Sequence, residues 1–398
     1  MAAGADANRV IERAVERVLP EAISLSHTLH ANPETAFEEY ASAALVADLL
    51  AGHGFEVTRG IVGVPTAFDA RIGDGGPTIA FCAEYDALPG IGHACGHNVI
   101  AATSAAAGIA LAAVAADLDV TVRVIGTPAE ESGGGKVVLL ERGVFDGVGM
   151  AAMVHPAPRD VVDARSLALD DIVIRLGGLE AHASAAPYLG RNAADAATLG
   201  QVAVGLLRQH LLPDQQVHGI VTNGGVAPNI IPASSELAYY LRAGDRESLA
   251  QLWSRIDDCY AGAARATGCT HEIHRVCPTY HELTADPWLV ESYRTAILAR
   301  GRSPLPPDRE RVDTFGSTDM GNITNVLPGI HPLIGIDAGG AVLHQPAFAD
   351  AVVGPSANAA IEDGAIALAV VAAAAAADPR QREKLLRPAS PRPGDGSR

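Results

Sequence analysis

A cysteine and a histidine lie two residues apart in the run Gly92-His93-Ala94-Cys95-Gly96-His97-Asn98. Asp86 lies upstream of this run, and the carboxylate pair Glu130-Glu131 and then His155 follow it. A thiolate, imidazoles and carboxylates together are the ligands of a Zn²⁺- or Mn²⁺-type site. Taken alone, Cys-Gly-His is equally typical of a partly buried cysteine beside a loop histidine. The rest of the chain must therefore decide between these two interpretations.

Glu130 and Glu131 are adjacent, so we expect their side chains to point in different directions. One carboxylate could then bind a metal while the other faces substrate and water, a division that suits hydrolysis with a general base. An isolated Glu-Glu pair would indicate only a solvated acidic loop. Here Pro128 stiffens the entry to the pair, and three glycines after Ser132 allow close approach of the backbone. These neighbours favour a site.

Cys95 and His97 are expected on one side of an extended loop because alternate residues share a face. Gly96 lets the backbone pass close to an ion. A helix beginning near Asn98 would place its N-terminal dipole beside the Cys95 thiolate and favour the ionised form. Cys95 could instead be a covalent nucleophile. That alternative leaves the carboxylates and the other histidines unexplained.

The candidate ligands follow the ends of predicted strands. Strands are expected over 78–83, 120–125, 151–154 and 332–336, with helices over 8–30, 38–52, 98–116, 136–142, 287–301 and 357–377. Alternating strands and helices indicate an α/β fold with a mostly parallel sheet and helices on both faces. Four of these strands are each followed by candidate ligands: Asp86 and Cys95 after the first, Glu130 after the second, His155 after the third and His344 after the fourth. Ligands of open α/β sheets bind at the carboxyl ends of strands.

The pattern changes near residue 167. Strands are expected over 168–176, 216–223, 236–243 and 270–276, with helices over 193–210 and 247–267. The order β-α-β-β-α-β is that of a ferredoxin-like domain. We therefore expect a catalytic domain from residues 1–166 and 279–380, interrupted by an inserted domain at 167–278. Residues 381–398 are rich in Pro, Arg and Ser, which predicts a disordered tail.

Composition excludes several classes of protein. The 398 residues carry a net charge of −17, which argues against nucleic acid or an anionic membrane as a partner. Five irregularly spaced cysteines in so long a chain do not indicate a disulfide framework, and a reducing, cytoplasmic compartment fits. The first residues lack the apolar stretch of a signal peptide. The alanine-rich run 365–377 is expected to be a packed helix, because it is too short for a membrane span.

Taken together, the motifs resemble the amidohydrolase branch of the dinuclear metallopeptidases, which includes aminoacylases, auxin-conjugate amidohydrolases and bacterial dipeptidases. The likeness is strongest to the β-alanyl-lysine-type dipeptidases and the p-aminobenzoyl-glutamate hydrolase subunit. The matching segments are 30–34, 84–89, 92–98, 126–136, 155–156, 182–187, 224–232, 316–322 and 344–348.

This resemblance implies a role for each candidate residue. Two divalent ions, Zn²⁺ or Mn²⁺, would be bound by five ligands: Cys95, His97, Glu131, His155 and His344. Glu130 would be the general base, and Asp86 would orient a ligand. In the insert, His182 would stabilise the oxyanion across the interface of a homodimer, and Asn229 and Arg242 would bind the substrate carboxylate or the oxyanion. The insert would act as dimerisation domain and lid.

The expected activity is hydrolysis of the amide bond of a dipeptide or an N-acyl amino acid by a metal-activated water. Asn98 replaces an aspartate common in the branch, Asn32 replaces a histidine, and Ser132 separates the doublet from the glycines. None of these departures removes an expected ligand. The alternative is a catalytically silent binding or regulatory protein on the same scaffold, because a fold does not determine function. The complete ligand set favours the enzyme.

Overall fold

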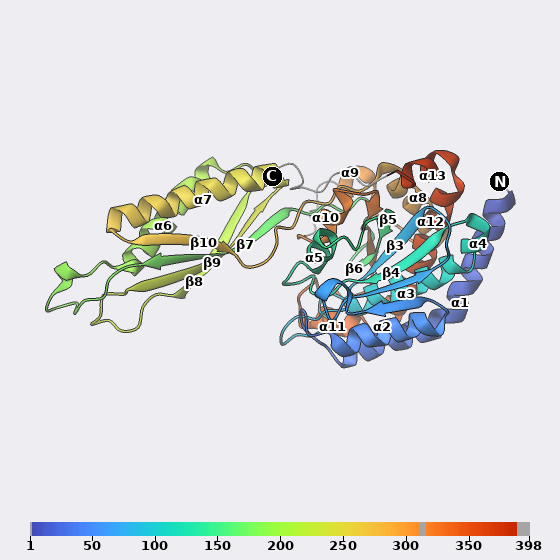
Figure 1. The fold of residues 1–398 in the computed structure, drawn as a ribbon, viewed down its shortest axis with the longest axis horizontal. Coiled ribbons are helices and arrows are strands. Elements are labelled where there is room, and N and C mark those ends of the chain that lie inside the picture. The colour runs from blue at the N-terminus through green and yellow to red at the C-terminus, as the bar shows by residue number, and fades with distance from the viewer. Residues whose placement is uncertain (1, 311–315, 388–398) are drawn as a thin grey trace. The chain divides into compact units, whose positions relative to one another are not determined.

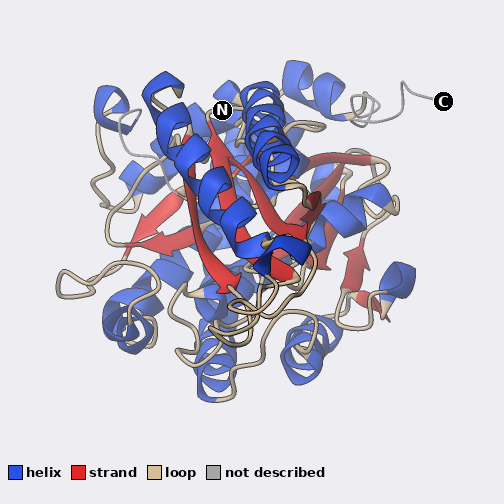
Figure 2. Ribbon diagram, turned by 90° about the vertical axis from the view of Figure 1, so that its left-hand side faces the viewer, coloured by secondary structure: helices blue, strands red, loops and turns tan. Residues whose placement is uncertain are grey.

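The computed structural model describes residues 2–310 and 316–387 of the chain. These residues combine helices and strands, drawn in blue and red in Figure 2. They form two compact units. One unit joins Met1–Arg165 to Leu283–Arg398, and the other is the continuous segment Ser166–Glu282. The boundaries expected from the sequence, 167 and 278, lie one and four residues inside those of the second unit.

A six-stranded sheet is the centre of the first unit (Figure 1). Its strands, in spatial order, are β1 (Glu56–Arg59), β2 (Phe68–Ile72), β4 (Thr121–Gly126), β3 (Thr78–Ala83), β5 (Val148–Ala152) and β11 (Gly329–Ile330). The last four are parallel to one another, whereas β1 and β2 are antiparallel additions at one edge. Two short strands, β6 (His155–Ala157) and β12 (Leu333–Gly335), form a separate parallel pair. The mostly parallel sheet is confirmed, and the antiparallel edge is an addition to the prediction.

Both faces of this sheet are buried. Along β3, Ile79, Phe81 and Ala83 belong to one hydrophobic core, whereas Ala80 and Cys82 belong to another. The first core is covered by α1 (Ala2–Ala31), α2 (Tyr40–Gly52), α3 (His97–Ala112), α8 (Pro287–Ala299) and α12 (Pro355–Ala377). The second is covered by α5 (Gly135–Glu141) and α10 (Met320–Thr324). Successive side chains of a strand point to opposite faces of the sheet, so the single strand β3 contributes side chains to both cores.

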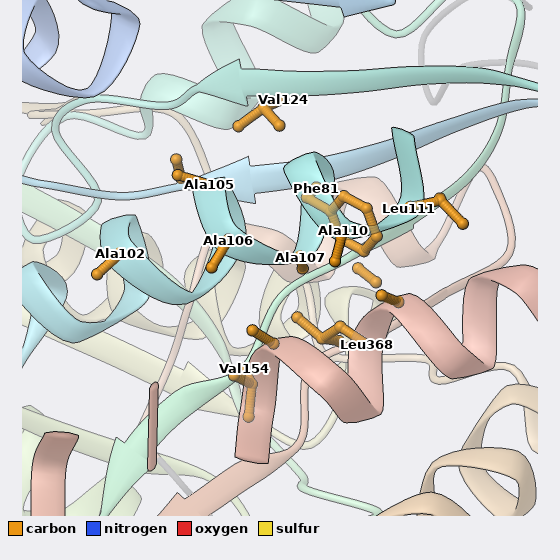
Figure 3. Close-up of a cluster of buried hydrophobic side chains, with 14 of the residues drawn as sticks. Phe81, Ala102, Ala105, Ala106, Ala107, Ala110, Leu111, Val124, Val154 and Leu368 are labelled. Atoms are coloured by element: carbon orange, nitrogen blue, oxygen red, sulfur yellow. The ribbon is translucent and has the colours of Figure 1, made fainter. Parts of the chain in front are cut away.

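Alanines of α3 allow this helix to pack tightly between the sheet and α12. Figure 3 shows Ala110 of α3 beside Phe81, and Ala102 and Ala106 of the same helix belong to the same buried cluster as Phe81 and Leu368. At Gly108 a Cβ atom would lie only 2.3 Å from Val124 Cγ2, so even alanine would not fit there. Among the described residues, α12 is the helix long and apolar enough to cross a membrane, and 72% of its most apolar stretch is buried within the protein. A helix in the core of a protein can meet the same criteria of length and composition.

The second unit has the β-α-β-β-α-β order expected for it. Its elements are β7 (Ala168–Gly177), α6 (Ala193–Leu207), β8 (Gln216–Asn223), β9 (Ser234–Ala243), α7 (Arg246–Thr267) and β10 (Thr270–Arg275). The strands form an antiparallel sheet in the order β10-β7-β9-β8, and both helices lie on one side of it (Figure 1). Strand β8 is an edge, and nearly all of its residues are exposed.

The C-terminal prediction was partly wrong. Residues 379–385, assigned in part to a disordered tail, form helix α13 (Pro379–Leu385). Asp378 caps this helix by accepting hydrogen bonds from the backbone N–H groups of Arg380 and Gln381. Leu385 is buried, and the Arg382 guanidinium donates to the Leu118 carbonyl, so tertiary contacts order a polar sequence. Residues 388–398 of the predicted tail lie outside the described residues.

The remaining helices are short. They are α4 (Ala115–Leu118), α9 (Pro307–Glu310) and α11 (Pro346–Ala351). The single helix expected over 98–116 is therefore two helices, because α3 ends at Ala112 and the chain turns before α4.

Candidate metal and catalytic site

The Asp86 carboxylate holds the imidazole of His97 at the start of α3. Asp86 Oδ1 lies 2.9 Å from His97 Nδ1, and both side chains are fully buried. Burial alone would raise the pKa of Asp86 and lower the pKa of His97, but their mutual attraction outweighs burial, so the pKa of Asp86 is lowered and that of His97 raised. An ionised Asp86 accepts from Nδ1–H, which leaves His97 Nε2 buried without a hydrogen-bond partner.

Cys95 and His155 form a second buried contact. Cys95 Sγ lies 3.5 Å from His155 Nε2, and His155 Nδ1 lies 2.8 Å from the Pro156 carbonyl oxygen. Because a carbonyl only accepts, Nδ1 carries the proton and Nε2 presents its lone pair towards Cys95. Burial, followed by the charge of His331, lowers the pKa of His155 and keeps the ring neutral. A neutral imidazole whose other nitrogen donates to a carbonyl is the usual form of a metal ligand.

The strand expected over 151–154 ends earlier: β5 ends at Ala152, and His155, which follows it as expected, is the first residue of strand β6. The helix expected to begin near Asn98 begins at His97, so Cys95 lies just before α3. Burial, and then the charge of Glu131, raise the pKa of the thiol well above its ordinary value. A protein-only environment therefore favours the neutral thiol, which does not support Cys95 as a nucleophile.

The two glutamates converge on the same imidazole, contrary to the expectation that they diverge. Glu130 Oε2 lies 3.8 Å from His97 Nε2, and Glu131 Oε1 lies 3.9 Å from it. Glu131 Oε1 also lies 3.4 Å from His344 Nε2. The backbone N–H of Glu131 donates to Asp86 Oδ2 over 3.0 Å, so Asp86 holds both His97 and the loop of the doublet. Burial and then the charges of Glu84 and Glu131 raise the pKa of Glu130.

Three groups of side chains have ligand atoms close enough to share a cation. They are Cys95–His97–His155, Cys95–Glu131–His344 and Glu84–His97–Glu130, and within each group these atoms lie within 4.8 Å of one another. The first two groups share Cys95 and contain all five predicted ligands. His97 Nε2 and Glu131 Oε1 are buried without hydrogen bonds, as expected of atoms that bind a cation. Sulfur, nitrogen and carboxylate donors together suit Zn²⁺ or Mn²⁺, so the residues fit the implied metals.

The predicted residues of the insert lie on the second unit. His182 forms an isolated bridge with Ile230, and the Asn229 carbonyl accepts from the Ala183 N–H, so the His182 and Asn229 segments are adjacent. His182 Nδ1 accepts from the backbone N–H groups of Ser184 and Ala185, which leaves the proton on Nε2 of an exposed ring.

Arg242 lies elsewhere on this unit. It belongs to β9, where it pairs with Leu169 and Gln216, whereas the His182 loop follows Gly177, which pairs with Ser234 at the opposite end of β9. Its Nε donates to His218 Nε2 over 3.4 Å. The second unit therefore brings His182 and Asn229 together but not Arg242.

Residues 80–377 match the family profile of peptidase family M20/M25/M40. The chain belongs to this family. The Xaa-Arg dipeptidase of Mus musculus is 39% identical over 355 residues, covering 82% of this chain and 79% of the relative. A p-aminobenzoyl-glutamate hydrolase subunit of Escherichia coli K12 is 35% identical over 295 residues, covering 68% of this chain and 61% of the relative.

Solved structures share the M20 fold. An aminobenzoyl-glutamate utilization protein from Klebsiella pneumoniae has a TM-score of 0.68 at 20% identity and covers 91% of this chain and 98% of its own. A dinuclear metal-binding peptidase of the M20 family from Bacillus subtilis has a TM-score of 0.65 at 22% identity and covers 90% and 99%. The resemblance drawn from the motifs is confirmed, and the chain is an M20-family hydrolase.

The M20 site also contains a buried charge network that the sequence did not reveal. Lys136 Nζ donates to Glu84 Oε1 and, over 2.6 Å, to Asp319 Oδ1, and all three side chains are fully buried. The Lys136 backbone N–H donates to Asp319 Oδ2. Burial alone would lower the pKa of Lys136, but the two carboxylates raise it. The position of Glu84 directly after the apolar residues 79–83 could have indicated a buried carboxylate, but its partners come from distant segments.

Proposed function

We propose that the chain hydrolyses the amide bond of a dipeptide or an N-acyl amino acid, with two divalent ions as cofactors. The placement of Glu130 is the observation that carries this proposal. Its carboxylate lies beside His97 but belongs to neither of the groups that contain Cys95. The names of two relatives, an Xaa-Arg dipeptidase and a p-aminobenzoyl-glutamate hydrolase subunit, support substrates with an amide bond next to a free carboxylate.

In this proposal Cys95, His97, Glu131, His155 and His344 hold the ions, which are Zn²⁺ or Mn²⁺. When bound, such ions polarise an amide carbonyl and make water more acidic. Asp86 keeps Nδ1 of His97 protonated, so that Nε2 is the ligand atom. The Pro156 carbonyl does the same for His155.

Glu130 would move the proton. Its carboxylate takes a proton from the attacking water as the new C–O bond forms, and gives that proton to the amine nitrogen as the C–N bond breaks. The products are a carboxylic acid and a free amine, so atoms and charge balance. Burial raises its pKa, and a carboxyl group that holds a proton more firmly than usual is better suited to take the proton and then to give it up to the amine.

The second unit would complete the site in a homodimer and close as a lid. His182 offers Nε2–H as a donor to the oxyanion, and Asn229 and Arg242 are candidates for binding the substrate carboxylate. Apolar side chains exposed on α6 and on the edge strand β8 support self-association: Leu199, Val202, Leu206, Ile220 and Val221. A cytoplasmic location is supported by five free cysteines.

Metal-stripped protein, reconstituted with Zn²⁺ or Mn²⁺, should be screened by mass spectrometry against α-dipeptides, β-alanyl and γ-aminobutyryl dipeptides, and N-acyl amino acids. We expect cleavage of at least one class with metal and none with chelator. Full activity of metal-free protein, abolished by alkylation of Cys95, would instead support a cysteine nucleophile. Tight binding without cleavage by metal-loaded protein would support a silent scaffold.

A further inference from the structure

Glu39 is a buried carboxyl group outside the proposed catalytic machinery. It immediately precedes α2, and its side chain is fully inaccessible to solvent. Its Oε1 accepts a hydrogen bond of 2.9 Å from the backbone N–H of Ala129, ninety residues further along the chain. Ala129 immediately precedes Glu130, so Glu39 contacts the backbone from which the proposed base projects.

Ala129 has a backbone conformation that needs external support. Its φ of 59° lies in the left-handed region, where the Cβ atom of an L-residue comes too close to the backbone carbonyl oxygen. A glycine would adopt this conformation at little cost, and glycines occur nearby at 133–135. Position 129 is nevertheless an alanine. The hydrogen bond to Glu39 opposes relaxation of Ala129 to an ordinary conformation, because rotation of its N–H would break that bond.

A second carboxylate holds the other side of Glu130. The backbone N–H of Glu131 donates to Asp86 Oδ2 over 3.0 Å. The amide groups of both neighbours of Glu130 are therefore bound to buried carboxyl groups from different parts of the chain. This arrangement fixes the backbone on both sides of the base, and with it the direction of the Glu130 side chain.

The segment that carries Glu39 also packs along the same loop. Phe37 lies so close to Gly133 that a Cβ atom there would come within 2.5 Å of Phe37 Cε2 and 3.1 Å of Ala129 Cβ. Phe37 itself has a positive φ of 61°. The Thr66 side chain and the backbone amides of Phe37 and Glu39 also interact with the Glu39 carboxyl group, which holds it in place beside the loop.

We propose that Glu39 is a positioning residue for Glu130, acting by holding the Ala129 N–H in place. The inference rests on the proposed role of Glu130 as general base. It assigns Glu39 no contact with substrate or metal. The role requires a hydrogen-bond acceptor within bonding distance of the Ala129 N–H, and it does not require a negative charge.

Three variants of Glu39 separate reach from charge. Glu39→Gln keeps an acceptor oxygen at the same reach without charge, Glu39→Asp keeps the charge but is one methylene shorter, and Glu39→Met removes both. Burial and then the charge of Asp86 raise the pKa of Glu39 to about 7, so a neutral group of this shape is compatible with the site. Glu38→Gln, at an exposed neighbour, is the matched control.

The readouts are kcat, KM, bound metal per chain, and hydrogen exchange in peptides that contain the Ala129 amide. We expect Glu39→Asp and Glu39→Met to lower kcat about 10- to 100-fold with unchanged KM and metal content, and to speed exchange at Ala129. Glu39→Gln and Glu38→Gln should stay close to the unaltered protein. If Glu39→Met does not fold, the comparison of kcat between Glu39→Gln and Glu39→Asp still tests the proposal.

The inference is overturned if Glu39→Asp keeps full kcat while Glu39→Gln loses it, or if the loss of activity follows loss of metal. Glu130→Gln, measured in the same series, separates this failure from failure of the proposed function. An active Glu130→Gln variant refutes the base itself. An inactive Glu130→Gln variant together with fully active Glu39→Asp and Glu39→Met variants refutes only the positioning role.

Discussion

Asp86 binds two parts of the candidate site at once, through His97 Nδ1 at 2.9 Å and the Glu131 N–H at 3.0 Å. Both of its oxygens are therefore used, and the side chain is buried. One residue thereby couples the orientation of an imidazole ligand to the position of the carboxylate doublet, although these elements are 34 residues apart, from 97 to 131.

Asp86→Asn should weaken metal binding. The amide can accept through only one atom, so either His97 or the Glu131 N–H loses its partner. Loss of such an orienting group typically costs 10- to 100-fold in metal affinity. Competition with a coloured chelator would measure the change. Asp74→Asn, at an exposed carboxylate, is the control, and equal metal affinity in both variants would contradict the role given to Asp86.

Glu130→Gln should leave a folded, metal-loaded protein that has lost hydrolysis. Removal of a general base typically lowers kcat about 10²- to 10⁴-fold. Circular dichroism and metal analysis would verify that fold and metal are retained, and single-turnover kinetics would report the chemical step. Glu141→Gln changes an exposed carboxylate on α5 and should be as active as the unaltered protein. Near-normal turnover of Glu130→Gln would remove Glu130 from the mechanism.

Lys136→Met should destabilise the protein strongly. The substitution leaves Glu84 and Asp319 buried side by side without their cation, and breaking a buried pair costs about 3–5 kcal/mol. Urea unfolding measures the loss. Arg59→Met breaks the ion pair with Asp48, in which both side chains are exposed, and should cost no more than about 1 kcal/mol. Similar losses in the two variants would show that the Lys136 network adds little stability.

The metal-free protein should lose stability in acid through His331. Burial is the main cause that lowers the pKa of this histidine to about 4, from an ordinary value of 6.5. Between these two pH values His331 is protonated in the unfolded chain but not in the folded chain. Its contribution to the free energy of unfolding is therefore complete above pH 6.5 and is lost as the pH falls towards 4. The loss from this one group is about 3 kcal/mol. Urea unfolding at several pH values should show a shallower dependence in His331→Phe, and an unchanged slope would contradict the prediction.

The motifs around Cys95 indicated which side chains lie close together because local rules carried the information. Residues that follow the ends of parallel strands meet at one edge of a sheet, so Cys95, Glu131 and His344 could be grouped before any contact was known. The apolar run within 78–83 predicted β3 because burial imposes a recognisable pattern on a strand. Short polar edge strands such as β1 carry no such pattern and were missed.

Contacts that join distant segments exist only in the folded chain. The residue types, their order and their placement after strands were enough to indicate the family and the ligand chemistry. It did not indicate that Lys136 meets Glu84 and Asp319, that Glu39 reaches the Ala129 N–H, or that both glutamates approach His97. A buried charge must find its partner wherever the packed chain brings one, and no local pattern records a partner ninety residues away.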